Sequence, residues 1–296
     1  MPELPEVETI VRDLNTQKLA CTGILRSHVF WNRSIALPKH TRFCDEIRGA
    51  QILRFHRHGK LIAADLTGGK TLFIHLRMTG KILIRKEASA LPHERVRLDL
   101  SDGRFLSFLD TRKFGRWYLT PQPGSILNRL GPEPFGTIFT PAWLEKQLQK
   151  HRRRLKPLLL DQSFVAGLGN IYADEALWES RLHPARMSHS LRPDETRDLH
   201  TAIRKVLRRG IRNLGTSLGS NATHYYSVGG RRGRNQDALN IFRKTGLPCP
   251  RCKKTIQRLV IAQRSTHICP ACQPLKKYNS ARARRHRLFP GSTPPH

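Results

Sequence analysis

Four cysteines near the C-terminus have the spacing of metal ligands. Cys249 and Cys252 form one pair, and Cys269 and Cys272 form a second pair after an interval of sixteen residues. Two such pairs of thiolates complete a tetrahedral shell for Zn²⁺. A closed four-sulfur shell leaves no position for water, so the spacing predicts one structural zinc ion that folds a small two-stranded hairpin.

The amino terminus carries a second set of reactive groups. Pro2 is small and should permit removal of Met1, which exposes a secondary amine that can attack a sugar C1′ and form an iminium. Glu3 and Glu6 beside it can accept or donate protons during that attack. Taken alone, the same residues fit a simpler interpretation in which they only cap the first helix. The residues by themselves leave both interpretations open.

The charge balance indicates a polyanionic partner. The chain has 53 Lys and Arg against 22 Asp and Glu, a formal net charge of +31, and a pI of about 11.1. No stretch approaches the ~18 apolar residues of a membrane span, and no basic amphipathic helix stands apart from the fold, so nucleic acid is favoured over a membrane surface. The first residues lack the features of a secretory signal, and we expect a cytoplasmic, nucleoid-associated protein. Cys21 and Cys44 are expected to be reduced thiols.

The elements that must position these groups follow from residue periodicity. A first amphipathic helix is predicted from Pro5, because Val7, Ile10 and Leu14 recur at helical spacing. Between about residues 23 and 120 short runs such as 61–66 and 70–76, and the alternation of Val96, Leu98 and Leu100 with polar residues, predict the strands of a sandwich or barrel. A stretch rich in proline and glycine over 121–136 is interpreted as a linker.

The rest of the chain is predicted to be helical up to about residue 215. Thr140 and Pro141 have the types of an N-cap and a first helical residue. The segment 215–235 is polar, rich in glycine and arginine, and too long for an ordinary connection, so it is either a mobile functional loop or a disordered insert. The basic segment after the cysteines is predicted to be a disordered tail.

Several segments then resemble one family in the same order along the chain. The start, MPELPEVET over residues 1–9, is similar to that of formamidopyrimidine-DNA glycosylases. The other matching segments are Gly59-Lys60, HLRMTG at 75–80, DTRKFG at 110–115, LLDQ at 159–162, GLGNIYADE at 167–175, and the cysteine module.

The resemblance implies an α+β multidomain fold. It consists of an N-terminal β-sandwich with an N-terminal catalytic helix, a helical helix-two-turns-helix domain, and a C-terminal β-hairpin zinc finger. With the boundaries above, we expect the catalytic domain at 1–130, the DNA-binding domain with a lesion-capping loop at 137–235, the zinc finger at 236–273, and the basic tail at 274–296.

The resemblance also implies an activity. It predicts a bifunctional DNA glycosylase and AP lyase of base excision repair that removes 8-oxoguanine and formamidopyrimidines from damaged double-stranded DNA and acts as a monomer. Pro2 would form the Schiff base and Glu3 would donate and relay protons. Lys60 would contact phosphate and assist β-elimination, and Arg264 would do the same for δ-elimination.

A base inside a stacked duplex must be rotated out and its gap filled. Met78, Arg112 and Phe114 match the family's gap-filling residues, although a lone Met or Phe in a β-rich domain is more often core. Flanking polar residues and glycines favour loop tips. Four further residues are expected to contact DNA, namely His93, Arg152, Lys156 and Asn170, the last with backbone amides of a helix N-terminus around a phosphate.

The sequence departs from the family at several positions. Arg77 stands where glycine is usual, Thr111 replaces a usual proline, and Arg95 replaces a histidine. The 215–235 loop does not follow the usual lesion-capping sequence, which leaves the lesion and opposite-base preference open. Two rival functions therefore remain: an endonuclease VIII-like glycosylase for oxidised pyrimidines, and a non-catalytic zinc protein that binds damaged DNA.

Overall fold

The computed structural model describes residues 1–218, 225 and 227–275. Its helices are α1 (Leu4–Thr16), α2 (His40–Ile47), α3 (Gly124–Leu127), α4 (Pro141–Lys150), α5 (Leu155–Leu160), α6 (Asn170–Glu179) and α7 (Pro193–Arg212). Its strands are β1 (Ile24–Val29), β2 (Ile35–Leu37), β3 (Ile52–His58), β4 (Leu61–Leu66), β5 (Thr71–His75), β6 (Lys81–Arg85), β7 (Glu94–Leu100), β8 (Phe105–Leu109), β9 (Arg116–Thr120), β10 (Gln257–Ile261) and β11 (Arg264–Ile268).

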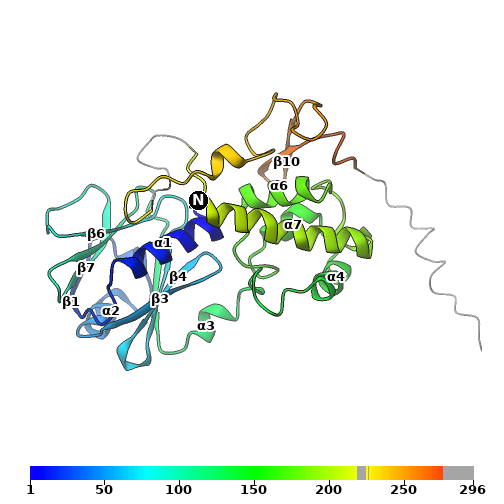
Figure 1. Ribbon diagram of the computed structural model, residues 1–296. Coiled ribbons are helices and arrows are strands. Elements are labelled where there is room, and N and C mark those ends of the chain that lie inside the picture. Colours follow the sequence, from blue (N-terminus) through cyan, green and yellow to red (C-terminus); the bar gives the residue numbers. More distant parts are fainter. Residues whose placement is uncertain (219–224, 226, 276–296) are drawn as a thin grey trace, which may run out of the picture.

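The first nine strands form a β-sandwich (Figure 1). One sheet has the strand order β1-β7-β8-β6, and the other has the order β2-β9-β5-β4-β3. The alternating apolar residues Val96 and Leu98 of β7 are buried and share one core with Ile62 and Ile74 of the facing sheet. Alternation along each strand turns the apolar side chains toward the opposite sheet. This confirms the predicted sandwich.

Helix α1 is shared by two hydrophobic cores. Its middle residues Val7, Ile10 and Leu14 are buried in the sandwich core, whereas Leu4 at its start belongs to the core of the helical part. The helix lies beside β3 and also against α7 (Figure 1). The end of the chain that carries Pro2 is therefore held between the two halves of the molecule.

The segment predicted as a linker is packed against the sandwich. Helix α3 lies within it, and its residues Ile126 and Leu127 cover Leu61 and Phe73 on the outer face of the five-stranded sheet. This second cover explains why β4 and β5 are buried on both faces rather than alternating.

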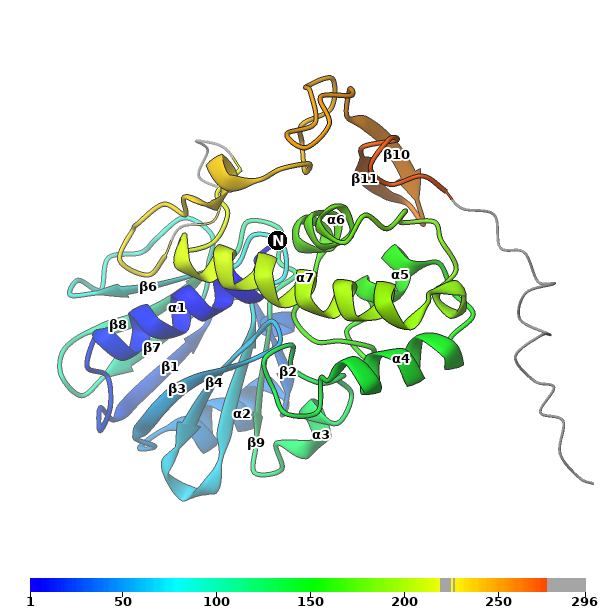
Figure 2. The ribbon, with the colours of Figure 1, turned by 45° about the vertical axis from the view of Figure 1, so that its right-hand side comes forward.

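Helices α4 to α7 form the second half, with α6 at its centre. Helix α6 is buried along almost its whole length, and α7 packs across it. As expected, Thr140 caps α4 by accepting the backbone N–H of Trp143 at 3.1 Å, with Pro141 as the first helical residue. Figure 2 shows the β10–β11 hairpin lying over α6, so α6 separates the hairpin from α7.

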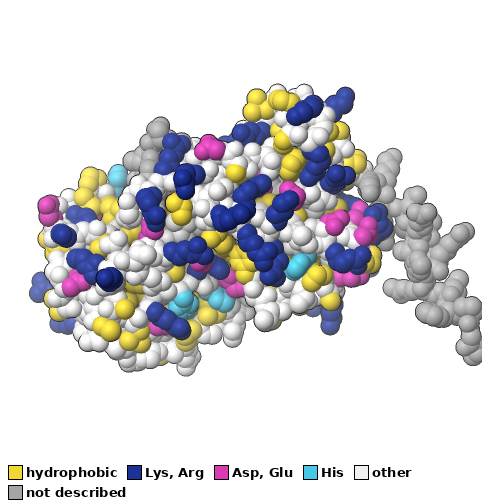
Figure 3. Space-filling model, in the orientation of Figure 1, with side chains coloured by type: hydrophobic (Ala, Val, Ile, Leu, Met, Phe, Trp, Pro, Cys, Tyr) yellow, Lys and Arg dark blue, Asp and Glu magenta, His cyan; other side chains and the backbone are white. Residues whose placement is uncertain are grey.

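Basic side chains spread over the face that α1 and α7 cross, and acidic ones are fewer there (Figure 3). This agrees with the net charge of +31. None of the helices in the described part of the chain has the length and apolar character that crossing a bilayer requires. Most of the predicted basic tail, residues 276–296, and residues 219–224 and 226 of the predicted loop lie outside the described residues.

Candidate active site

Six of the predicted site residues line one cleft of about 610 Å³ between the sandwich and the helical half. They are Glu3, Lys60, Met78, Phe114, Asn170 and Arg264. Pro2 lines a smaller adjoining pocket of about 60 Å³, together with Glu6, Thr216 and Tyr225. The two spaces share Met78 and Ile171 in their walls. The structure thus brings residues from six distant segments of the chain around one opening.

The Glu3 side chain caps helix α6. Its two carboxylate oxygens accept the backbone N–H groups of Ile171 at 3.0 Å and Tyr172 at 3.3 Å. The approach requires glycine at position 169, because a Cβ there would lie 2.3 Å from the Glu3 Cδ atom. The positive end of the helix dipole stabilises a carboxylate at this position. The amides of Ile171 and Tyr172, which were expected to surround a phosphate, are instead bonded to Glu3, and the phosphate contact of Asn170 stays a prediction.

A second buried carboxylate, Glu6, lies one helical turn further along. It accepts the backbone N–H groups of Glu3 at 2.8 Å and Thr216 at 2.7 Å, and the hydroxyl of Tyr172 at 2.8 Å. Burial is the main reason that its pKa rises to about 7, and the nearby charge of Glu3 adds to the rise. Asn235 completes the network by donating to the Thr216 hydroxyl at 2.9 Å. Glu6 thus links the catalytic helix to the start of the 215–235 segment.

Lys60 lies in the two-residue turn between β3 and β4 and is buried. Burial lowers the pKa of its ammonium to about 8, while the carboxylates of Glu3 and Glu6 oppose that shift. The preceding Gly59 has a φ of +56°, and its backbone N–H donates to Glu133. Position 59 therefore favours glycine, and the turn directs the Lys60 ammonium into the cleft.

Met78 and Phe114 are exposed apolar side chains on two neighbouring loops. They are 42% and 45% exposed, which excludes the alternative that they are core residues. The Arg112 guanidinium lies 4.8 Å from the centre of the Phe114 ring, and its Nη1 atom lies 3.0 Å from the Met78 sulfur. The three side chains form a single protruding unit, called the wedge below.

Arg264 directly follows the tip of the β10–β11 hairpin. The two turn residues, Ala262 and Gln263, have φ values of +48° and +60°, so the turn is of the primed type that suits the strand twist. These φ values are strained for residues other than glycine. The turn places Arg264 as the first residue of β11, and its side chain lines the cleft.

The structure contradicts the expectation that Lys156 contacts DNA. Lys156 is completely buried, and its ammonium forms an ion pair with Asp174 at 2.6 Å. It also donates to the carbonyl of Ser265 at 2.8 Å and to the hydroxyl of Thr266 at 2.9 Å. A lysine so enclosed cannot reach a phosphate. Its place is to hold β11 against α5 and α6.

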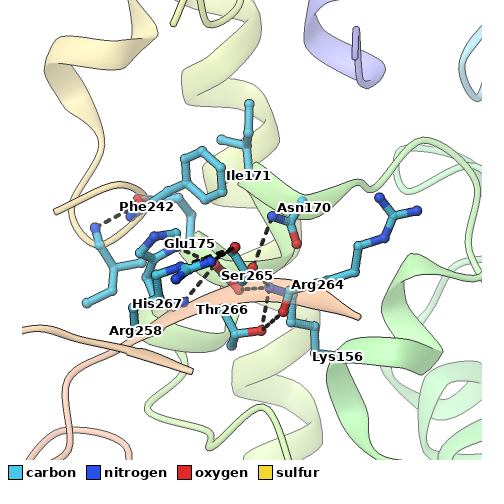
Figure 4. Close-up of polar contacts among 12 residues, drawn as sticks. Lys156, Asn170, Ile171, Glu175, Phe242, Arg258, Arg264, Ser265, Thr266 and His267 are labelled. Atoms are coloured by element: carbon cyan, nitrogen blue, oxygen red, sulfur yellow. Dashed lines mark hydrogen bonds and ion pairs between the residues drawn. The ribbon is translucent and has the colours of Figure 1, made fainter. Parts of the chain in front are cut away.

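Asn170 assists this attachment. Its amide donates to the same Ser265 carbonyl at 3.1 Å. Figure 4 shows Lys156 and Asn170 approaching the backbone next to Arg264, whose guanidinium extends away from both. Among the described residues, the Asn170 Oδ1 atom is buried without a hydrogen-bond partner. Asn170 therefore positions the strand that carries Arg264 and also lines the cleft.

The remaining predicted DNA contacts lie outside the cleft lining. His93 and Arg152 are both exposed, and His93 has a φ of +65° at the turn before β7. The Arg95 side chain, at the position of the family's histidine, lies 3.5 Å from the His93 ring nitrogen. Their role in DNA binding stays a prediction.

The four predicted cysteines gather into one cluster. All four sulfur atoms lie within 4.8 Å of one another, with 3.9 Å between Cys249 and Cys272 and 3.3 Å between Cys252 and Cys269. A tetrahedral Zn²⁺ with bonds of about 2.3 Å requires sulfur separations of about 3.8 Å. The cluster therefore fits one structural zinc ion.

The zinc module is attached along the full length of α6. The buried Glu175 accepts the backbone N–H groups of Asn240, Ile241 and Phe242 at 2.8–3.0 Å. At the C-terminal end, the Arg251 guanidinium lies 4.1 Å from the centre of the Trp178 ring and donates to the Trp178 carbonyl at 3.0 Å. One helix thus binds the Glu3 carboxylate at its N-terminus and carries the module with Arg264.

Sequence reasoning missed the buried polar partners of the site. Tyr172, Thr216 and Asn235 surround Glu6, and Asp174 pairs with Lys156. The one available signal lay in the matched segment 167–175, where a tyrosine and two acidic residues fall on a helix that is otherwise apolar. An acidic residue on an apolar helix requires a buried partner.

Three family models match the chain. Residues 1–117 match the formamidopyrimidine-DNA glycosylase N-terminal domain, residues 130–221 match the H2TH domain of the same enzymes, and residues 246–275 match the zinc finger found in FPG and IleRS.

Individual proteins show the same similarity. A formamidopyrimidine-DNA glycosylase of Protochlamydia amoebophila is 46% identical over 274 residues, which span 92% of this chain and 99% of that protein. Among solved structures, the MutM (FPG) protein of Thermus thermophilus is 38% identical, with a TM-score of 0.83 over 93% of this chain and all of the other. A Lactococcus lactis FPG variant in complex with DNA containing Fapy-dG is 34% identical, with a TM-score of 0.84 over 92% of this chain and all of the other.

Proposed function

The chain belongs to the formamidopyrimidine-DNA glycosylase family, and we propose that it excises oxidised purines through a Schiff base on Pro2. It is a DNA glycosylase of oxidised-purine repair, with strand cleavage at the abasic site as a second activity. The observation that supports the roles of individual residues is the shared cleft, where Glu3, Lys60 and Arg264 lie around the opening next to Pro2.

The first step forms a bond between the Pro2 nitrogen and the sugar C1′ of the damaged nucleotide. Removal of Met1 frees the amine, and attack on C1′ breaks the bond to the base, which leaves with the electron pair. Opening of the sugar ring then gives the iminium, and the ring oxygen takes up a proton. Position 2 suits this role because α1 holds it at the junction of the two cores, in the wall of the pocket that adjoins the cleft.

Two carboxylates divide the proton transfers. Glu3 is held by the amides of Ile171 and Tyr172 at the edge of the cleft, which fixes its oxygens for transfer to and from the sugar. Glu6 has a pKa of about 7, so near neutral pH it exchanges protons readily. The Glu6 carboxylate accepts the backbone N–H of Glu3, the residue that directly follows Pro2 and its amine.

Elimination follows from the iminium, because the C2′ proton is acidic beside it. Loss of that proton and of the 3′ phosphate is β-elimination, and loss of the 5′ phosphate is δ-elimination. Lys60 in the β3–β4 turn and Arg264 at the start of β11 line the same cleft. Together they supply positive charge for the two phosphates. Arg264 comes from the zinc module, so the zinc ion supports this step only by folding the hairpin.

The wedge fills the space left by the rotated nucleotide. Met78 and Phe114 offer apolar surface that can stack in the gap, and Arg112 offers donors to the unpaired opposite base. The proposed substrates are 8-oxoguanine and formamidopyrimidine in duplex DNA, and the chain acts on them as a monomer in the compartment that holds the chromosome.

Borohydride trapping tests this function. The wild-type chain is incubated with duplexes that carry 8-oxoguanine opposite cytosine or an oxidised pyrimidine, and is compared with a chain that retains Met1. We expect a covalent adduct and nicking on the 8-oxoguanine strand, and neither when Met1 is retained. An adduct on the pyrimidine lesion alone would indicate an endonuclease VIII-like enzyme, and no adduct on either duplex would indicate a non-catalytic damage binder.

A further inference from the structure

Asp110 lies at the base of three loops that face the cleft. It directly follows the last residue of β8, is 1% exposed, and lies just before the loop that carries Arg112 and Phe114. Its backbone N–H donates to the carbonyl of His93 at 2.9 Å, and its carbonyl accepts the Arg95 Nε–H at 2.8 Å. The backbone of this residue thus already joins two of the loops.

The Asp110 side chain adds the third loop. One carboxylate oxygen accepts the Thr79 hydroxyl and the backbone N–H of Arg112, the latter at 3.2 Å. The other accepts the backbone N–H of Gly115 at 2.7 Å. Thr79 directly follows Met78, whereas Arg112 and Gly115 enclose Phe114. One carboxylate therefore fastens both halves of the wedge.

The wedge is only partly packed against the rest of the described chain. Met78 and Phe114 are 42% and 45% exposed, and their mutual contact runs through Arg112. An exposed loop tip is ordered only as well as the hydrogen bonds at its base allow. The Phe108 ring packs tightly against the base of both loops. A Cβ atom at Gly80 would lie 2.9 Å from this ring, and a Cβ atom at Gly115 would lie 2.2 Å from it.

We propose that Asp110 is a positioning residue for nucleotide extrusion, whose carboxylate holds the Met78 loop and the Phe114 loop as one rigid wedge. It touches neither the substrate nor the reacting atoms. The inference rests on the proposed function, because it assigns a mechanical part to the rotation of the damaged nucleotide. Three donors converge on two oxygens, which an ionised carboxylate satisfies and a neutral amide cannot.

The test compares Asp110→Asn with Asp99→Asn. Asp99 lies in the same sheet on β7, and its carboxylate also holds two side chains, His28 at 2.8 Å and Arg97 at 3.1 Å, but neither belongs to the wedge. Both substitutions remove one charge and keep the side-chain size. A general effect of the lost charge therefore appears in both variants, and loss of the fold would also abolish the bubble incision described next.

Two readouts separate extrusion from chemistry. The first is the fluorescence of 2-aminopurine placed next to the lesion in duplex DNA, which reports unstacking and requires no bond breaking. The second is single-turnover excision of 8-oxoguanine from a duplex, compared with incision at an abasic site inside an unpaired bubble, where no base pair has to open.

We expect Asp110→Asn to lose most of the fluorescence rise and to slow excision at least about tenfold, with bubble incision changed less than about twofold. Asp99→Asn should match the wild type in all three. Wild-type unstacking by Asp110→Asn, a parallel loss of bubble incision, or a wild type that does not unstack the duplex would each overturn the inference. Normal unstacking by the wild type without a borohydride adduct would refute the proposed chemistry and leave this inference standing.

Discussion

The Glu3 carboxylate accepts the backbone N–H of Ile171 at 3.0 Å, which joins the amino terminus to a residue 168 positions later in the sequence. The carboxylate proposed to donate protons is thus also the cap on the N-terminus of α6. The same hydrogen bond positions the proposed proton donor and the N-terminus of the helix that carries the zinc module. A change at Glu3 should therefore affect both the activity and the stability of the protein.

Glu3→Gln should therefore lower activity and stability together. Loss of a positioned proton donor should slow excision by about 10²–10⁴-fold. The weaker cap on α6 should cost about 0.5–2 kcal/mol in the free energy of unfolding. Single-turnover kinetics and urea denaturation measure the two effects. Glu8→Gln is the control, because Glu8 is a partly buried carboxylate of the same helix that pairs with Arg12 and Arg57 outside the cleft, and equal losses in both variants would contradict the assignment.

The pKa of Lys60 should appear in the pH profile. Burial lowers this pKa from 10.5 to about 8. The Lys60 side chain is therefore a charged ammonium below about pH 8 and a neutral amine above it. We expect kcat/KM to fall as the pH rises through about 8, and Lys60→Arg, which stays charged, to lack this fall. Between about pH 8 and 10.5 the folded chain binds fewer protons than the unfolded one, so the free energy of unfolding should rise with pH. The control, Lys70→Arg, should keep the wild-type dependence of kcat/KM on pH. If Lys60→Arg also keeps it, the proposed role of Lys60 is refuted.

Loss of one zinc ligand should unfold the zinc module and leave the sandwich folded. Cys252→Ala opens the sulfur shell, and the small module depends on metal for its fold. We expect DNA binding to be abolished while the sandwich still unfolds cooperatively, as measured by band shift and near-ultraviolet circular dichroism. Cys21→Ala, outside the cluster, should bind normally. Full affinity of Cys252→Ala would sink the assignment of a zinc-dependent clamp.

Breaking the buried pair of Lys156 and Asp174 should displace Arg264. Lys156→Met leaves Asp174 buried without its partner at 2.6 Å, which costs about 3–5 kcal/mol for such pairs. The strand next to Arg264 loses its anchor, so we expect β-elimination products to accumulate at the expense of δ-elimination products. Lys156→Met combined with Asp174→Asn should recover part of the stability. A normal product ratio in Lys156→Met, with the exposed Lys150→Met as control, would show that Arg264 is held by other contacts.

Local patterns were sufficient for elements whose residues are close in sequence. The alternation of Val96, Leu98 and Leu100 predicted β7, and the spacing of the cysteines predicted the zinc cluster, because each depends on neighbours a few residues apart. The resemblance added the residues of the cleft. One of the departures from the family also has a physical explanation. Arg77 has a φ of +52°, a conformation that favours glycine, the usual residue of the family at this position.

Contacts between distant segments could not be predicted in this way. Lys156 was predicted to contact DNA because its position resembles a DNA-contacting one in the family, but its carboxylate partner is on another helix. Glu3 gave no sign that it caps α6. The segment 121–136 has the composition of a linker, yet Ile126 and Leu127 pack on the sheet. Tertiary burial decided each of these cases, and composition does not record it.

Helix α6 has a practical consequence for protein engineering. The zinc module is attached to it by Asp174, Glu175 and Trp178, and Trp178 completes the small buried core that the module forms with Ile241, Cys249, Ile256 and Cys269. A transplanted finger that consisted of the cysteine segment alone would bind metal but would present Arg264 at no defined angle. A portable version must include α6 as its mounting, and the recipient must supply an acidic residue in place of Glu3 to close the end of that helix.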